Sequence, residues 1–313
     1  MPKPPPETRV RAAAGSDWQA LSLLLVGGLM LAIIVNLSKG GARLGLSAAQ
    51  ITFFFSLGGG TLLLGIDRFR AHPPLRGRHL RAYAALGAVS YAVPTTLGAV
   101  VAARVDAGFA SVLISLSPVL TFALAVLLGM QGMSRRQGAG LLLGLVGTWL
   151  LVLPGLTRPG ETAVVWMLLG LVIPASLATG NILRTRLVPV ETPNRLMVIG
   201  VLLAAALYLA PFALSTPLSP AGTGAAAALL AAGALVTAGF NLVLFQLQKV
   251  AGPVRLSQVG YVAAAFGILV AAVAFGERPR PSLLAAVAFI VAGIRLVNAA
   301  RPSGARTREA AGE

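Results

Sequence analysis

The chain lacks cysteine altogether and has few charged residues for its length. Cysteine is absent from all 313 residues, which excludes disulfides, thiol nucleophiles and thiolate metal sites. Charged residues make up 11% of the chain and hydrophobic residues 57%, and the mean hydropathy is +0.84. This composition suits a lipid solvent better than water, and the apolar stretches leave no length for a soluble catalytic domain.

Acidic residues are especially scarce, at nine Asp and Glu against 25 Lys and Arg. Asp67, Asp106 and Glu277 lie near the ends of apolar stretches, and no carboxylate lies at the middle of one. Proton-coupled export of a cation usually needs an acid that exchanges its proton for the cargo. The sequence therefore argues against a pump for lipophilic cations.

The chain also has little of what an enzyme needs. Its two histidines, His72 and His79, fall in or beside a basic loop, and no Ser-His-Asp, H-E-x-x-H or paired-carboxylate arrangement occurs. We therefore predict that the protein is not an enzyme and has no cofactor or metal.

What the chain does have is a succession of ten apolar stretches, each of about 17 to 27 residues, separated by short and mostly basic breaks. A bilayer core needs about 20 apolar residues per helix, so the pattern predicts an all-α polytopic membrane protein with an uncleaved first helix. The predicted spans are 18–38, 47–66, 80–103, 107–130, 137–153, 164–183, 196–214, 221–247, 254–275 and 282–300.

The distribution of basic residues predicts an orientation. With the N-terminus inside, 19 Lys and Arg lie on the cytoplasmic side and six on the other. This bias follows the positive-inside rule and predicts a multi-pass protein of the plasma (inner) membrane with both termini cytoplasmic. The densest basic run, Arg68 to Arg81, is expected to touch anionic lipid. We expect no nucleic-acid partner, because no basic patch is interleaved with aromatic residues on a soluble module.

The two halves of the chain resemble each other at an offset of about 147 residues. The matching elements are Trp18 with Trp166, Asn36–Lys39 with Asn181–Arg184, and Ala125–Gly129 with Ala272–Gly276. We therefore divide the chain into a tail (1–17), a first repeat (18–153), a linker (154–163), a second repeat (164–300) and a second tail (301–313). Five helices is an odd number, so the second repeat enters the membrane inverted, as in many secondary transporters. A duplicated scaffold without transport is the alternative.

Polar residues deep inside the predicted spans are candidates to line a site, because polar groups in hydrocarbon are costly unless they face protein or a cavity. In the third span, Tyr91 and Thr95 lie one turn apart on one helix face, and in the fourth span Ser111, Ser115 and Pro118 do the same. The proline frees a backbone carbonyl, which can line a site or be satisfied by a neighbouring hydroxyl.

The second repeat offers two further groups of polar and aromatic residues at helical spacing. They are Thr237, Asn241, Phe245 and Gln248 in the eighth span, and Gln258 with Tyr261 in the ninth. Hydrogen bonding between helices is the alternative role for Asn241 and Gln258. Gly140 and Gly144 form a G-x-x-x-G pattern, which serves either a homodimer face or packing within the monomer.

Lys39 and Arg184 are the repeat-related basic pair, predicted at opposite membrane faces. They are candidates for attracting an anionic group at each mouth or for alternating gates. The alternative is that each side chain snorkels to lipid head groups.

The chain resembles the drug/metabolite transporter superfamily, specifically EamA-type proteins with two five-helix repeats. The resemblance rests on Asp106–Gly129 as the fourth helix, Arg136–Leu153 as the fifth, and the Gly-Glu pair at Gly276 and Glu277. It implies that the third, fourth, eighth and ninth helices line a central cavity. Together with the spacing, this predicts substrate contacts at Tyr91, Thr95, Ser115, Asn241, Gln258 and Tyr261.

The sequence thus predicts a secondary transporter that exports a small neutral, zwitterionic or anionic metabolite, amino-acid-like, by alternating access. The expected partners are that small-molecule substrate and membrane lipid, with a homodimer left open by the G-x-x-x-G pattern. The alternative is a flippase for a lipid-linked precursor or a membrane scaffold. A long cavity that opens sideways to lipid would favour the flippase, and a closed polar pocket at the midplane would favour the metabolite.

Overall fold

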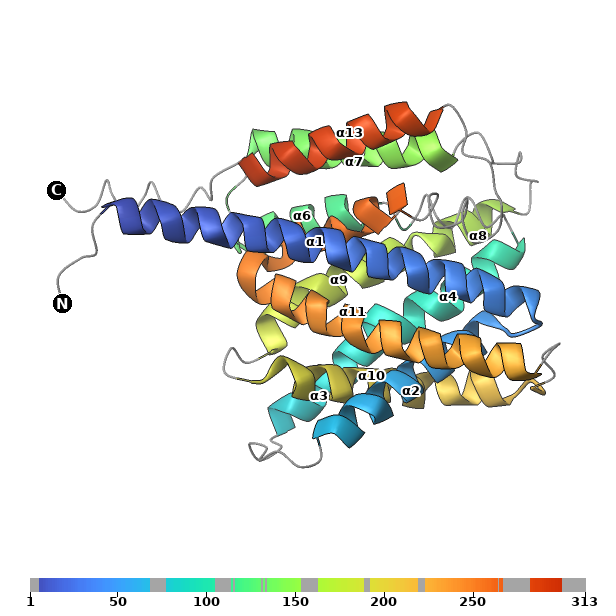
Figure 1. The fold of residues 1–313 in the computed structure, drawn as a ribbon. Coiled ribbons are helices and arrows are strands. Elements are labelled where there is room, and N and C mark those ends of the chain that lie inside the picture. Colours follow the sequence, from blue (N-terminus) through green and yellow to red (C-terminus); the bar gives the residue numbers. More distant parts are fainter. Residues whose placement is uncertain are drawn as a thin grey trace.

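The computed structural model of the chain describes residues 6–67, 77–104, 114, 116–130, 132, 134–152, 163–188, 192–218, 223–263, 265–266 and 282–299 (Figure 1). Within these ranges every regular element is a helix, as the apolar pattern predicts. Of the predicted spans, 107–130 and 254–275 reach furthest outside the described residues.

Helices account for both halves of the chain (Figure 1). The first half contains α1 (Pro6–Arg43), α2 (Ala48–Asp67), α3 (Gly77–Gly87), the π-helical turn η1 (Ala88–Ala92), α4 (Val93–Arg104), α6 (Ser117–Leu127) and α7 (Arg135–Val152). The second half contains α8 (Ala163–Gly170), α9 (Val172–Leu187), α10 (Asn194–Leu214), α11 (Thr223–Ser257) and α13 (Ser282–Ala299).

Five helices in the described part of the chain are long and apolar enough to cross a membrane. They cover Asp17–Arg43, Ala48–Asp67, Leu168–Leu187, Asn194–Leu214 and Thr223–Ser257. The other predicted spans either divide into shorter helices or reach beyond the described residues. The structure therefore supports a polytopic helical protein, while the count of ten spans stays a prediction.

The start of α2 follows from its sequence. The Ser47 amide donates to Oε1 of Gln50 at 2.9 Å, and the Gln50 amide donates to Oγ of Ser47 at 3.2 Å, which together form a capping box. The Gln50 amide nitrogen Nε2 also donates to the carbonyl of Thr216 at 3.1 Å. One side chain thus begins α2 and fastens it to the segment that follows α10.

Between α3 and α4 the helix widens into a π turn just before Pro94. The Val93 amide donates to the carbonyl of Ala88, five residues back, so the carbonyl of Val89 loses its usual α-helical donor. Pro94 carries no amide hydrogen to replace it. The Ser176 hydroxyl of α9 donates to Val89 O at 2.7 Å and so satisfies the carbonyl from outside the helix.

The predicted break between the eighth and ninth spans is a kink rather than a loop. Gly252 has φ 74° and ψ −178°, a conformation that only glycine adopts readily, and Pro253 follows it. The helix resumes on the other side and ends at Ser257. The chain therefore changes direction without leaving the helical core, and Gln258 begins the next turn.

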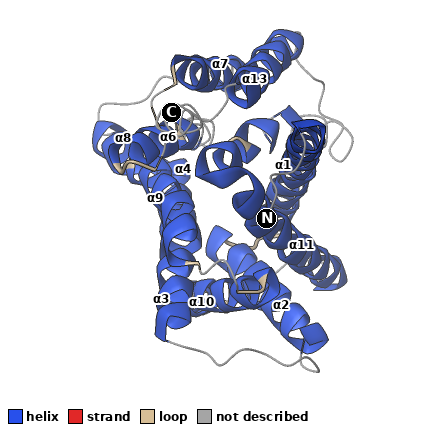
Figure 2. Ribbon diagram, turned by 90° about the vertical axis from the view of Figure 1, so that its left-hand side faces the viewer, coloured by secondary structure: helices blue, strands red, loops and turns tan. Residues whose placement is uncertain are grey.

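Helices that correspond in the two repeats pack against each other. α13 begins 147 residues after α7 and has the same 18 residues of length, and the two helices lie side by side. α2 packs on α10 in the same way. Figure 2 shows these pairs on opposite sides of the molecule, with α1 and α11 on one flank and α4, α6, α8 and α9 on the other.

The close approach of α7 and α13 depends on glycine. A methyl group on Gly140 would lie 2.7 Å from the carbonyl oxygen of Gly293, and one on Gly293 would lie 2.8 Å from the amide nitrogen of Gly144. The G-x-x-x-G pattern of α7 is therefore occupied inside the monomer, by α13 and by the ring of Tyr261.

Candidate functional site

A polar contact joins the two halves of the molecule in its interior. The Tyr91 hydroxyl of η1 donates to Oδ1 of Asn241 on α11. Asn241 is fully buried, and its Nδ2 donates to the carbonyl of Thr237 one turn earlier at 2.9 Å, which holds its oxygen toward the tyrosine. Two residues 150 positions apart, both predicted to contact substrate, are thus brought together.

The segment that carries Tyr91 is held firmly on α9. Besides the Ser176 bond to Val89, Gly180 lies directly against the hydroxyl of Ser90, with no room for a methyl group between them. π turns inside α-helices are frequently found at functional sites. Such a turn changes the direction in which the side chains around it point. Here the turn is the element that places Tyr91.

Arg184 lies in the same region, on α9, and is 4% exposed. Its guanidinium carbon lies 4.8 Å from the centre of the Phe245 ring, a cation–π arrangement. Snorkelling to head groups is therefore wrong for Arg184, because its guanidinium stacks in the interior instead of reaching the surface.

Lys39, the repeat partner of Arg184, is exposed near the end of α1. The two repeats thus use the same Asn-x-x-basic pattern differently. The Asn36 Nδ2 donates within α1 to Ala32 O at 2.9 Å, whereas Asn181 Nδ2 reaches across to Thr121 Oγ1 of α6 at 3.2 Å. A gating role for Lys39 stays a prediction.

Two hydrogen bonds beside Arg184 were not predicted from the sequence. Gln248 Nε2 of α11 donates to Oγ1 of Thr185, and Asn181 donates to Thr121, whose own hydroxyl donates to Ser117 O at 2.8 Å. The available signal was the spacing of Asn181 and Thr185, four apart on α9. Nothing in the sequence indicates their partners, which lie 60 and 63 residues away.

Gln258 and Tyr261 lie beyond the kink, away from the Tyr91–Asn241 contact. The Tyr261 hydroxyl donates to the carbonyl of Leu141 in α7 at 3.0 Å, and the side chain packs in a different hydrophobic cluster from the one beside Tyr91. Gln258 is fully buried and its Nε2 donates to Val254 O at 3.5 Å. The structure does not join these two residues to Tyr91.

The remaining predicted contacts differ in what the structure says of them. Thr95 is half-buried one turn after Tyr91, which agrees with their shared face. Ser115, like Ser111, lies outside the described residues. Among the side chains that the structure describes, no group of three or more His, Asp or Glu gathers as a metal site would need.

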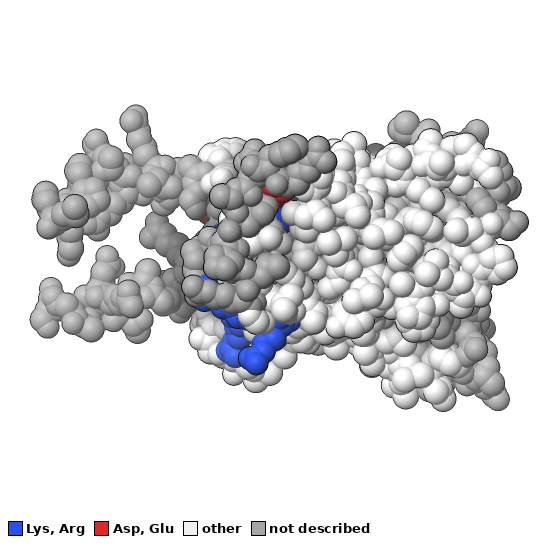
Figure 3. All heavy atoms as spheres, turned by 90° about the horizontal axis from the view of Figure 1, so that it is seen from below, with Lys and Arg blue, Asp and Glu red and all other residues white. Residues whose placement is uncertain are grey.

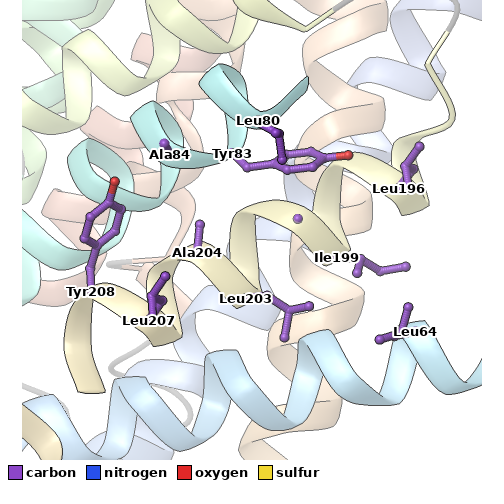
Figure 4. Close-up of a pocket in the computed structure, with 11 residues that line it drawn as sticks. Leu64, Leu80, Tyr83, Ala84, Leu196, Ile199, Leu203, Ala204, Leu207 and Tyr208 are labelled. Carbon is purple, nitrogen blue, oxygen red and sulfur yellow. The ribbon is translucent and has the colours of Figure 1, made fainter. Parts of the chain in front are cut away.

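One hollow in the described part of the molecule is a surface groove of about 450 Å³ between α2, α3 and α10. Figure 4 shows its lining, which is aliphatic apart from Tyr83 and Tyr208. Leu64, Leu207 and Tyr208 are exposed on the outside of the helix bundle. The groove therefore lies on the outer surface of the bundle. It is separate from the buried polar cluster, which consists of Tyr91, Arg184, Asn241 and Gln248.

These features define a class: a polytopic helical membrane protein built from two similar halves with a polar cluster between them. The model of the EamA-like transporter family matches the chain twice, over residues 18–153 and 164–299. The chain belongs to the EamA-like transporter family and is thus a membrane transporter of the drug/metabolite transporter type, which favours a transporter over an enzyme.

The fold also recurs among solved structures. One, described only as "Crystal structure of protein", has a TM-score of 0.74 and 19% identity, and the match covers 89% of this chain and 98% of that one. At this identity the likeness concerns the fold alone. No curated protein matches the chain.

Proposed function

We propose that the protein is a secondary transporter that exports a small neutral, zwitterionic or anionic metabolite, such as an amino acid, by alternating access. The observation that carries the proposal is the contact between Tyr91 and Asn241, which belong to different repeats. In transporters built from repeats, cargo binds near the midplane where the repeats meet. Polar groups buried in such a protein are costly and mark the pathway of the cargo.

The geometry suggests how the contact takes part in transport. The hydrogen bond from Tyr91 to Asn241 ties η1 of the first repeat to α11 of the second. Rocking of one repeat against the other would break this bond, and a polar cargo would then offer replacement partners to the phenol and the amide. The Tyr91 phenol and the Asn241 amide can therefore replace their bond to each other by bonds to the cargo, so that neither polar group is left unsatisfied.

The charges near the cluster support a cargo that is not a lipophilic cation. The two carboxylates whose side chains the structure describes are Asp17, paired with Arg255 at 2.8 Å, and Asp67, paired with Arg195 at 3.3 Å. Asp67, Arg195 and Arg255 lie in the first or last turn of their helices, and Asp17 lies where the apolar part of α1 begins, outside the cluster. The described part of the cluster offers hydroxyls, amides and a cation.

The surface groove supports membrane lipid as a neighbour more than as cargo. A flippase must carry a polar head group across the bilayer, and the groove offers it aliphatic side chains and two tyrosines. Its lining suits an acyl chain instead. The metabolite transporter is therefore the better proposal.

The proposal places the protein in the plasma (inner) membrane with both termini in the cytoplasm. Among the described residues on the face seen in Figure 3, Lys and Arg lie toward one end beside a small patch of Asp or Glu, and white, uncharged residues cover most of the remainder. Figure 1 shows that α1 and α10 begin, and α2 and α11 end, on the same side of the molecule, and these helices carry the Asp17–Arg255 and Asp67–Arg195 pairs. This is the end that the positive-inside rule assigns to the cytoplasm.

Reporter fusions test the orientation. A reporter active only in the cytoplasm should give signal when it is fused after residue 313 or inserted between residues 68 and 76. A reporter active only outside should give signal in the break at 154–162. An external C-terminus would overturn the proposed orientation.

Flux through proteoliposomes tests the transport site. Metabolomics of the medium from cells with and without the protein first identifies an exported compound. We expect Tyr91→Phe to reduce its flux by about fivefold, the worth of one neutral hydrogen bond of about 1 kcal/mol. Tyr208→Phe removes the same atom from an exposed tyrosine of α10 and should leave flux unchanged. Equal flux in all three proteins would remove Tyr91 from the site.

A further inference from the structure

We propose that the cargo carries a carboxylate, and that Arg184 of α9 is the counter-ion that binds it. This inference rests on the proposed function, because it names the class of substrate for the same buried cluster. It depends on four observations: the burial of Arg184, the pairing of the described carboxylates elsewhere, the ring beneath the guanidinium, and buried polar atoms without partners along α11.

The first observation is that a permanent positive charge lies inside an apolar molecule. Arg184 is 4% exposed, and its Nε is fully buried without a hydrogen-bond partner. Arginine does not lose its proton in proteins, so it cannot escape the cost of burial by neutralising. A buried charge is normally paired with an opposite one. Arg184 is thus a buried cation that a bound anion would stabilise.

The second observation is that the described carboxylates are engaged elsewhere. Asp17 binds Arg255 at 2.8 Å, and Asp67 binds Arg195 at 3.3 Å. Of the side chains that the structure describes, none supplies an acid to Arg184. A cargo that carries a carboxylate would supply the opposite charge to Arg184 from outside the protein.

The third observation concerns the direction in which the guanidinium is open. Its carbon lies 4.8 Å from the centre of the Phe245 ring, so one planar face is covered by the aromatic side chain. Stacking compensates only part of the cost of burial. It leaves the edge of the guanidinium available for two parallel hydrogen bonds to a carboxylate, the geometry for which arginine is best suited.

The fourth observation is a row of polar atoms on α11 that flanks Phe245. Thr237, Asn241, Phe245 and Gln248 follow one helix face. The hydroxyl of Thr237 and Oε1 of Gln248 are both buried without hydrogen-bond partners. These atoms are placed to receive the other polar groups of a cargo whose carboxylate lies on Arg184.

A panel of matched compounds tests the proposal on the full-length protein. Proteoliposomes are loaded with leucine, phenylalanine, serine and succinate, each beside its amide, and the amino acids also beside the amines that lack the carboxyl group. Efflux is measured by mass spectrometry against protein-free liposomes. We expect at least one carboxylate to leave about 10- to 100-fold faster than its matched amide and amine, the worth of a hydrogen bond between charged groups.

Variants then test the residue. Arg184→Gln should lower efflux of the transported carboxylate by about 10- to 100-fold, and Arg184→Lys should restore part of it because the charge returns without the bidentate edge. Arg186→Gln, which removes an exposed charge two residues further along α9, should stay within about twofold of the natural protein. Size-exclusion chromatography and thermal unfolding confirm that each variant is folded.

The outcomes separate this inference from the proposed function. If amides and amines leave as fast as the acids, or if folded Arg184→Gln carries the acid at the natural rate, the carboxylate proposal is overturned and transport stands. If no compound leaves faster than from protein-free liposomes, both proposals fail. The comparison of acids with amides needs no variant, so a poorly folding Arg184→Gln protein does not affect it.

Discussion

Tyr91 and Tyr261 show how the same side chain takes different roles at the residue scale. The hydroxyl of Tyr91 bonds an amide of the other repeat, in the polar cluster. The hydroxyl of Tyr261 donates to a backbone carbonyl of α7, and its ring fills the space beside Gly144. The first bond joins two groups that can take other partners, whereas the second satisfies a carbonyl in a packed contact between helices.

Tyr261→Phe should therefore affect stability more than transport. The substitution leaves the Leu141 carbonyl without its 3.0 Å donor and should lower the free energy of unfolding by about 1 kcal/mol. Flux per folded molecule should stay at the natural level. Thermal unfolding in detergent measures the first effect and liposome flux the second, with Tyr208→Phe as the exposed control. A loss of flux at unchanged stability would place Tyr261 in the site.

At the scale of elements, two interruptions of regular helix determine where side chains point. The π turn before Pro94 rotates Tyr91 and frees the Val89 carbonyl that Ser176 takes. The kink at Gly252 separates Gln248 from Gln258, which would otherwise continue along one helix. Both interruptions involve proline, because a residue without an amide hydrogen cannot continue the hydrogen-bond ladder.

Gly252→Ala tests whether the kink requires glycine. An added methyl group at Gly252 meets no atom within 4 Å, so any cost comes from the positive φ alone and should be about 1 to 3 kcal/mol of stability. Gly65 of α2 also has open space around it but has helical geometry. Gly65→Ala should stabilise by about 0.5 to 1 kcal/mol. If the two substitutions change the unfolding temperature alike, the kink does not depend on glycine.

At the scale of the whole molecule, contacts between corresponding helices hold the two repeats together. α2 with α10 and α7 with α13 form two such contacts on opposite sides of the bundle (Figure 2). The polar cluster lies among η1, α9 and α11, between these sides. Contacts between corresponding helices therefore flank the polar cluster on two sides.

Gly140→Ala should loosen the contact between α7 and α13. Its methyl group would lie 2.7 Å from Gly293 O, and overpacking of this kind costs about 1 to 3 kcal/mol. Gly138, two residues earlier on α7, has nothing within 4 Å, and Gly138→Ala should be neutral or stabilising. Thermal unfolding of the two variants makes the comparison. If the two variants are equally stable, α7 and α13 move apart to accommodate the methyl group without loss of stability.

The placement of some residues could be predicted from the sequence, and that of others could not. The repeat offset predicted that α7 and α13 correspond, and helical spacing selected Tyr91 and Asn241, which do meet. It also suggested snorkelling for Arg184, which is wrong. The spacing of residues along one helix tells which side chains share a face, but not which helix that face meets.

The sequence by itself determined that the chain is helical and apolar, since each backbone polar group in a membrane must be satisfied within its own segment. It also determined the duplication, because repeated residues keep their offset whatever the packing. Only the tertiary structure decided that Arg184 lies over Phe245 and that Ser176 satisfies Val89. These contacts join residues 61 and 87 positions apart, and they depend on which helices pack against each other in the folded protein.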